Sequence, residues 1–111
     1  MGTEPSMDIT IRARKVRVDE VLRAYIDRRL RFALGRFGEH ITKVTISFED
    51  ANGARGGVDK QCQIEVALRA SGSVLVDDID ADVRTVVDRV AERVARAVGR
   101  NLQRQRDARR L

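Results

Sequence analysis

Regularly spaced arginines are the chemistry-bearing residues that stand out in this chain. Near the C-terminus they recur every three or four residues, at Arg89, Arg93, Arg96, Arg100 and Arg104. At about 100° per residue, this row lies on one side of a helix, beside an apolar stripe. Like charges at this spacing cost a helix about 0.2–0.5 kcal/mol per pair, so stability alone does not explain the row. We call it the arginine ridge. Guanidinium groups suit phosphate oxygens, and the alternative is a solvated helix in an arginine-rich chain.

An earlier amphipathic segment carries a second set of basic residues. Arg23, Arg28 and Arg31 fall outside its apolar arc, whereas Arg29 falls inside the arc. A buried guanidinium without a partner is costly. Arg29 therefore either forms an ion pair with an acid or places its head in the groove between two helices, where it could bind phosphate. We include Arg29 among the predicted phosphate-binding residues on the second alternative.

The inventory of reactive side chains argues against an enzyme. A single cysteine, Cys62, excludes an internal disulfide and a cysteine-rich metal site, and a single histidine, His40, excludes histidine-based triads. Cys62 alternates with polar residues and is expected to be a small core residue. An acidic cluster lacks the spacing of a calcium loop, and we interpret it as the start of the last helix. This cluster comprises Asp77, Asp78, Asp80 and Asp82. We predict no cofactor and no metal.

Composition indicates one folded domain in which positive and negative charge lie in different segments of the chain. The chain has 111 residues, is 42% hydrophobic and 35% charged, and carries a net charge of +5. This apolar content argues against disorder. No apolar run is long enough to span a membrane and no signal peptide is seen, so we expect a cytoplasmic protein. Residues 7–38 carry +5, residues 39–79 carry −3 and residues 80–111 carry +4. Positive segments of this kind attract polyanions.

Hydrophobic periodicity predicts an α+β fold with the order β-α-β-β-β-α. The first crossover contains a helix, so the first two strands are expected to be parallel and the others antiparallel, in a four-stranded mixed sheet. Both helices should pack on one face, leaving the other face to water. The expected strands are 7–12, 43–49, 61–68 and 74–76, with helices over 19–37 and from 83 onward. Residues 1–6 are expected to be a flexible leader, 7–106 a single domain and 107–111 a frayed tail.

Two segments resemble a known family. Residues 9–10 (IT) with 16–30 (VRVDEVLRAYIDRRL) resemble the opening of the ribosome hibernation promoting factor and RaiA family. Residues 82–88 (DVRTVVD), with the basic and apolar residues that follow them, are similar to a second motif of that family. The element order above is also the family's. Two positions depart from the pattern: Arg84 replaces a usual tyrosine, and Phe32 stands where a basic residue is common.

The resemblance implies a ribosome-associated translation inhibitor with a fold like a double-stranded-RNA-binding domain. Such factors bind ribosomal RNA of the small subunit in the path of mRNA and tRNA, and promote hibernation under stress. The chain ends at Leu111, before any C-terminal dimerisation domain, so the short type and a monomer off the ribosome are expected. No membrane partner is implied. Carried over by position or added by helix geometry, the expected RNA contacts are Arg23, Arg28, Arg29, Arg31, Arg89, Arg93, Arg96, Arg100 and Arg104.

Two other functions remain open at this point. A generic double-stranded-RNA-binding module would bind isolated duplexes as well as ribosomal subunits, by shape and backbone contacts. A protein-interaction module would dock its basic face on an acidic partner and ignore RNA at moderate salt.

Overall fold

The computed structural model describes residues 7–50, 59–70 and 72–110. The expected leader, residues 1–6, and most of the loop 50–59 between the second and third expected strands lie outside these ranges. Four strands, two α-helices and one 3-10 helix follow the order β-α-β-β-β-α, as predicted. They are β1 (Asp8–Arg14), α1 (Glu20–Leu34), η1 (Gly35–His40), β2 (Ile41–Asp50), β3 (Lys60–Leu68), β4 (Ser73–Asp80) and α2 (Val83–Arg109).

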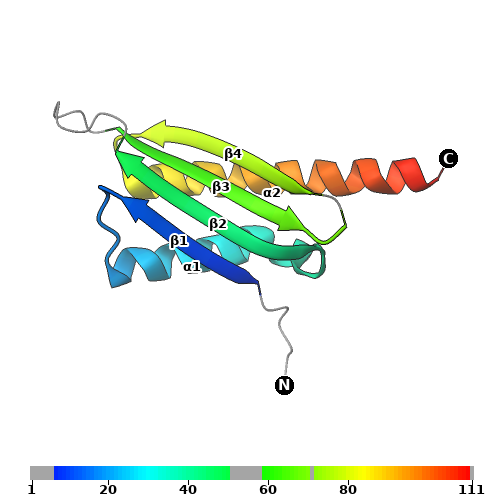
Figure 1. Ribbon diagram of the computed structural model, residues 1–111, viewed down its shortest axis with the longest axis horizontal. Helices are drawn as coiled ribbons and strands as arrows, with labels where there is room; N and C mark the ends of the chain where they lie inside the picture. The colour runs from blue at the N-terminus through cyan, green and yellow to red at the C-terminus, as the bar shows by residue number, and fades with distance from the viewer. Residues whose placement is uncertain (1–6, 51–58, 71, 111) are drawn as a thin grey trace, which may run out of the picture.

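The strands form one mixed sheet in the order β1-β2-β3-β4. β1 pairs with β2 in parallel, with Ile11 opposite Ile46, and the other two pairings are antiparallel. Both helices lie on the same face of the sheet, as Figure 1 shows. These findings confirm the predicted fold class. β1 and β4 are the edge strands.

The core lies between the sheet and the helices. Phe48, Ile46 and Ile64 from the strands are buried there with Leu30 of α1 and Val94 of α2. Among the described residues no polar or charged side chain is buried. Cys62 is fully buried in this layer, as predicted, and burial raises the pKa of its thiol to about 12. This thiol therefore stays protonated and contributes packing rather than chemistry.

Each α-helix begins at an aspartate that caps its first turn. The Asp19 carboxylate accepts a hydrogen bond of 2.8 Å from the backbone N–H of Leu22, and Asp82 accepts one of 3.0 Å from Thr85. The first helix was expected to reach residue 37, but α1 ends at Leu34 and the chain continues as η1. Glycines at positions 35 and 38 account for this tighter turn, because glycine weakens a regular helix.

The prediction for the acidic cluster was wrong for three of its four members. Asp77, Asp78 and Asp80 belong to β4, which is longer than expected, and only Asp82 caps α2. β4 extends this far because Asp78 lies opposite Cys62 and Asp80 opposite Lys60 on β3, on the helix side of the sheet. There the two aspartates meet basic side chains of α2, described below.

The last helix is the longest element. α2 has 27 residues, which corresponds to a length of about 40 Å. Its C-terminal part extends past the end of the sheet (Figure 1). The helix includes residues 107–109, for which the sequence suggested a frayed tail. Side-chain hydrogen bonds four residues apart, from Gln103 to Asp107 and from Gln105 to Asn101, support these last turns.

Candidate nucleic-acid interface

The first half of the arginine ridge is paired with acids of β4. The Nε atom of Arg89 lies 3.0 Å from Asp78 and its terminal nitrogen 2.9 Å from Asp80. Arg93 lies 3.3 Å from Asp78 and donates a hydrogen bond of 2.9 Å to the Asp77 carbonyl. Arg89 and Arg93, which we call the paired half, thus face carboxylates on the neighbouring strand.

This ion-pair network shifts the pKa values of Asp78 and Arg89. A hydrogen bond from the backbone N–H of Ile79, together with the Arg89 and Arg93 charges, holds the pKa of Asp78 below its usual value. Partial desolvation lowers the pKa of Arg89, but the hydrogen bonds and charges of Asp80 and Asp78 raise it overall. The paired half is therefore locally neutralised, and phosphate must compete there with carboxylates that are already in place.

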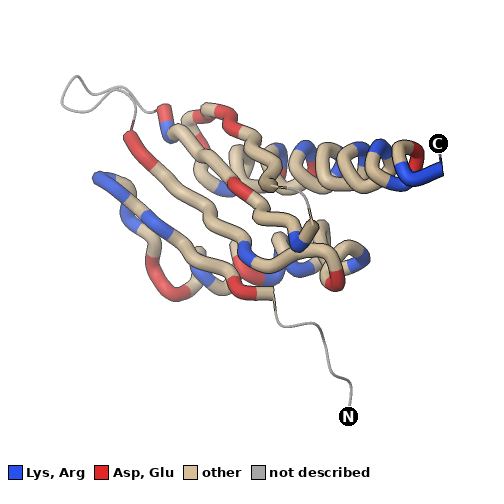
Figure 2. The backbone as a smooth tube through the Cα atoms, turned by 45° about the vertical axis from the view of Figure 1, so that its right-hand side comes forward, with Lys and Arg blue, Asp and Glu red and all other residues tan. Residues whose placement is uncertain are grey.

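The second half of the ridge is open. Arg100 and Arg104 are exposed, and in the described part of the chain neither forms an ion pair. We call these two residues the open half. Arg96, between the halves, lies 3.9 Å from Glu92 one turn earlier. Figure 2 shows that blue segments continue from here to the end of α2. The excess of positive charge along the ridge therefore lies in its C-terminal half.

Arg29 sits between the two helices and is paired. Its Nε atom donates a hydrogen bond of 3.2 Å to Asp88 of α2, and a terminal nitrogen lies 3.9 Å from Glu92. The Tyr25 hydroxyl donates a hydrogen bond to the same Asp88 carboxylate, which raises the pKa of Tyr25. The expectation of an unpaired head in the groove was therefore wrong. The Arg29 side chain reaches the helix–helix contact, where it forms an ion pair with Asp88.

Arg84, one of the departures from the family pattern, contributes to the same helix–helix contact. Its guanidinium carbon lies 4.6 Å from the centre of the Tyr25 ring. A cation over an aromatic face at this distance is attractive. Sequence reasoning missed this contact and the role of Asp88. The only signal in the sequence was that Arg29 needed an acid, and several aspartates were available to supply one.

The outer surface of α1 presents fewer free cations than expected. Arg31 is held by Asp27 at 2.9 Å and donates a hydrogen bond of 3.2 Å to the Met7 carbonyl. Arg23 and Arg28 are exposed and have no ion pair among the described residues. Phe32, the other departure, is 85% exposed, one turn from Arg28. Two arginines and one aromatic ring are thus available on this helix.

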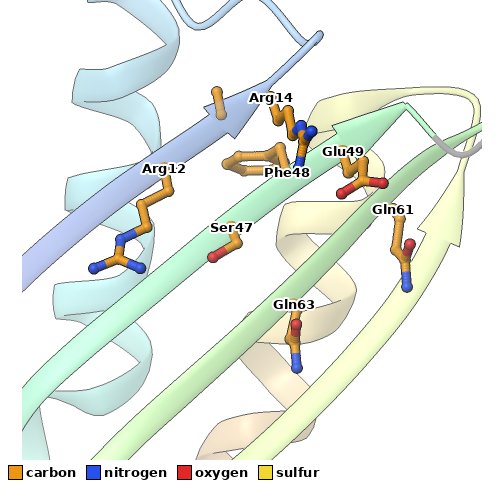
Figure 3. A pocket seen from close by; sticks show the side chains of 8 residues that line it. Arg12, Arg14, Ser47, Phe48, Glu49, Gln61 and Gln63 are labelled. Atoms are coloured by element: carbon orange, nitrogen blue, oxygen red, sulfur yellow. The ribbon is translucent and has the colours of Figure 1, made fainter. Parts of the chain in front are cut away.

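The opposite face of the sheet carries a shallow pocket. Its volume is about 270 Å³, and Figure 3 shows Arg12, Arg14, Glu49, Gln61 and Gln63 around it. Glu49 lies opposite Arg14 in the β1–β2 register. Because an acid and two amides share this surface with the arginines, it suits a long polyanion less well than the open half does.

The remaining chemistry of the described residues is limited. In the ranges that the structure covers, no group of three or more histidine, cysteine or acidic side chains could hold a metal ion. No helix in those ranges is long and apolar enough to cross a membrane.

Comparison with known proteins agrees with this geometry. Residues 9–106 match the model of the family described as sigma 54 modulation protein / S30EA ribosomal protein. The chain belongs to this family. It is a family of ribosome-associated hibernation and subunit-interface proteins. No curated protein matches the chain.

Solved structures share the fold, among them the following two. The N-terminal domain of Protein Y from Thermus thermophilus is 24% identical, with a TM-score of 0.71, over 85% of this chain and 98% of that chain. A ribosomal subunit interface protein from Coxiella burnetii is 16% identical, with a TM-score of 0.75, over 87% of this chain and 99% of that chain.

Proposed function

We propose that the protein binds ribosomal RNA of the small subunit in the path of mRNA and tRNA, and there inhibits translation and promotes hibernation under stress. One observation carries the proposal: a chain of this ribosomal family presents exposed arginines, Arg100 and Arg104, that no described acid neutralises. The helices α1 and α2 lie side by side on one face of the sheet. A duplex or a folded RNA backbone is recognised in this way, by shape and phosphate contacts.

The proposed binding surface is narrower than the set of residues expected from the sequence. Arg100 and Arg104 supply the phosphate contacts of α2, with Arg96 adjoining them, and Arg23 and Arg28 supply those of α1. Arg29 is paired with Asp88 and joins α1 to α2, and Arg31 is paired with Asp27 of its own helix, so neither is included in the surface. Phe32, fully in solvent beside Arg28, is available to stack on a base. The protein acts by occupying its site and performs no catalysis.

Sedimentation with purified subunits tests the proposal. The protein should co-sediment with small subunits, and not with large subunits or a short RNA duplex at the same salt concentration. Affinity should fall steeply between about 50 and 200 mM salt, because phosphate contacts release counterions. Addition of the protein to a translation extract should lower protein synthesis.

A matched control variant distinguishes binding through the proposed surface from a general effect of the protein's positive charge. Arg12→Gln/Arg14→Gln removes two exposed arginines from the opposite face of the sheet, and should leave small-subunit binding nearly unchanged. Equal binding to duplex RNA and to subunits would replace the proposal with a generic RNA-binding module. A salt-independent interaction would replace it with a protein-interaction module.

A further inference from the structure

A basic pocket is lined by residues of η1, the end of β3 and the last turns of α2. Its volume is about 580 Å³, within the range of about 300–1,000 Å³ that is usual for small-molecule sites. None of the residues that carry the proposed function lines it. Four arginines do: Arg36, Arg69, Arg106 and Arg109.

The charge of this pocket is uncompensated. Within the described residues, none of the four guanidinium groups forms an ion pair, and no acidic side chain lines the pocket. Glu39 and Asp107, which lie close in sequence to the pocket arginines, do not line the pocket, and the Asp107 carboxylate accepts a hydrogen bond from Gln103, four residues earlier on α2. Glu39 contributes its backbone carbonyl, which accepts a hydrogen bond of 3.1 Å from the Nε atom of Arg69. That bond orients Arg69 and leaves its terminal nitrogens to donate to an anion.

The pocket also has an apolar floor. Leu68 and Leu102 are almost fully buried beneath it, and the half-buried Phe37 forms one wall. The guanidinium of Arg36 lies over the Phe37 ring, 4.8 Å from its centre. A flat guanidinium held in this way offers its other face for stacking of a planar ring. A ligand that fills the pocket must therefore combine a planar, largely apolar group with a negative charge.

We propose that this pocket binds a nucleoside 5′-phosphate, with the base stacked on the free face of the Arg36 guanidinium and the phosphate on the guanidinium groups of Arg106 and Arg109. The same chemistry is carried by a free nucleotide and by an unpaired nucleotide at the end of an RNA strand. Inorganic phosphate lacks the planar group, and an acidic peptide lacks the flat ring that the floor and the Arg36 plane fit. The site does not depend on ribosome binding, since it involves none of the ridge residues.

Titration of the isolated protein tests this assignment. Adenosine 5′-monophosphate should shift the backbone amide resonances of His40, Leu68 and Arg69, and bind at least about tenfold more tightly than inorganic phosphate or adenosine alone. A 5′-phosphorylated single-stranded trinucleotide provides the RNA arm. Affinity equal to that of the monophosphate identifies a free nucleotide as sufficient, and a markedly higher affinity identifies an RNA end; either result supports the pocket.

Two variants with the same change of charge complete the test. Arg106→Gln/Arg109→Gln should weaken binding of adenosine 5′-monophosphate about tenfold, while Arg100→Gln/Arg104→Gln, on the other side of α2, should leave it nearly unchanged. All four positions are exposed, so both variants should keep the melting temperature of the wild type. Equal weakening by both variants, equal affinity for phosphate and nucleotide, or the same shifts with a glutamate-rich peptide would overturn the proposal.

Discussion

The two halves of the arginine ridge share one helix, one spacing and one residue type, yet their surroundings make them different groups. Arg89 and Arg93 lie beside β4, where Asp78 and Asp80 hold them at distances of 2.9–3.3 Å. Arg100 and Arg104 lie on the part of α2 that runs toward and past the end of the sheet, where no described acid reaches them. The carboxylates of the neighbouring strand thus neutralise one part of the arginine ridge and leave the other part unpaired.

This difference assigns the halves to different tasks. Partly exposed ion pairs contribute about 0–1 kcal/mol each to stability, so the paired half serves chiefly to attach α2 to the sheet edge. Unpaired guanidinium groups keep their full capacity for charge-assisted hydrogen bonds, so the open half serves binding. The comparison can be tested by changing each half separately.

Removal of the open half should have the largest effect. Arg100→Ala/Arg104→Ala should weaken small-subunit binding by about 2–3 kcal/mol, roughly 30- to 150-fold, because each charge-assisted contact is worth about 1.5–3 kcal/mol before losses. Co-sedimentation measures the affinity, and urea unfolding should show an unchanged midpoint. Arg89→Ala/Arg93→Ala is the matched control, with a smaller loss of affinity and a lower midpoint. Equal losses of affinity would remove the distinction between the halves.

Removal of the carboxylates that neutralise the paired half should strengthen binding to the small subunit. Asp78→Asn/Asp80→Asn removes the carboxylates that hold Arg89 and Arg93, and these two arginines then become available to phosphate. We expect an affinity gain of about 1 kcal/mol, roughly fivefold. The free energy of unfolding should fall by about 1 kcal/mol as the ion pairs are lost. Affinity that stays at the wild-type value would mean that this part of α2 does not contact the ribosome.

The helix–helix contact should respond in stability rather than in binding. Arg29→Met removes the hydrogen bond to Asp88 and leaves that carboxylate with Tyr25, so we expect a loss of about 0.5–1.5 kcal/mol in the free energy of unfolding. Thermal unfolding measures the change. Arg28→Met, one position away on the exposed surface, is the control and should not lower stability. A melting temperature that rises in Arg29→Met would indicate that the ion pair has no net structural value.

Acid should weaken the attachment of the paired half, with the smallest effect of the series. In the folded protein the pKa of Asp78 lies below 3.8, the usual value for an aspartate. Its stabilising contribution is therefore complete above about pH 4 and is lost as the pH falls through the folded-state pKa. Unfolding curves of the wild type should lose stability more steeply below this pH than those of Asp78→Asn. Parallel pH profiles would show that the ion-pair network is not coupled to folding.

Much of the fold followed from periodicity, whereas the partners of charged groups did not. Alternation of apolar residues placed the strands around Ile46 and Ile64, and three- and four-residue spacing placed both helices, because burial of one face imposes these periods. The start of the first helix was also placed correctly at residue 19, because the Asp19 cap acts within a few residues of the chain. Such local rules need no knowledge of the tertiary structure.

Most of the missed features depend on residues that lie on other elements of the fold. Asp78 and Asp80 were assigned to the start of a helix, because nothing local distinguishes that position from the end of a strand that faces arginines. The partner of Arg29 lies 59 positions away, at Asp88. The basic pocket joins residues of η1, β3 and α2, and none of its arginines was singled out, since each looked like a solvated charge.

The position of β4 at the edge of the sheet has a consequence for solubility. An edge strand presents unpaired backbone groups that can pair with another chain, and β4 also exposes two apolar side chains, Leu75 at 56% and Ile79 at 44%. If two copies of this edge approached each other, Asp77, an exposed carboxylate between Leu75 and Ile79 with no ion pair among the described residues, would come close to its counterpart and would repel it. Asp77 thus discourages pairing of one sheet edge with another, and a concentrated stock of Asp77→Asn should scatter more light than one of the wild type.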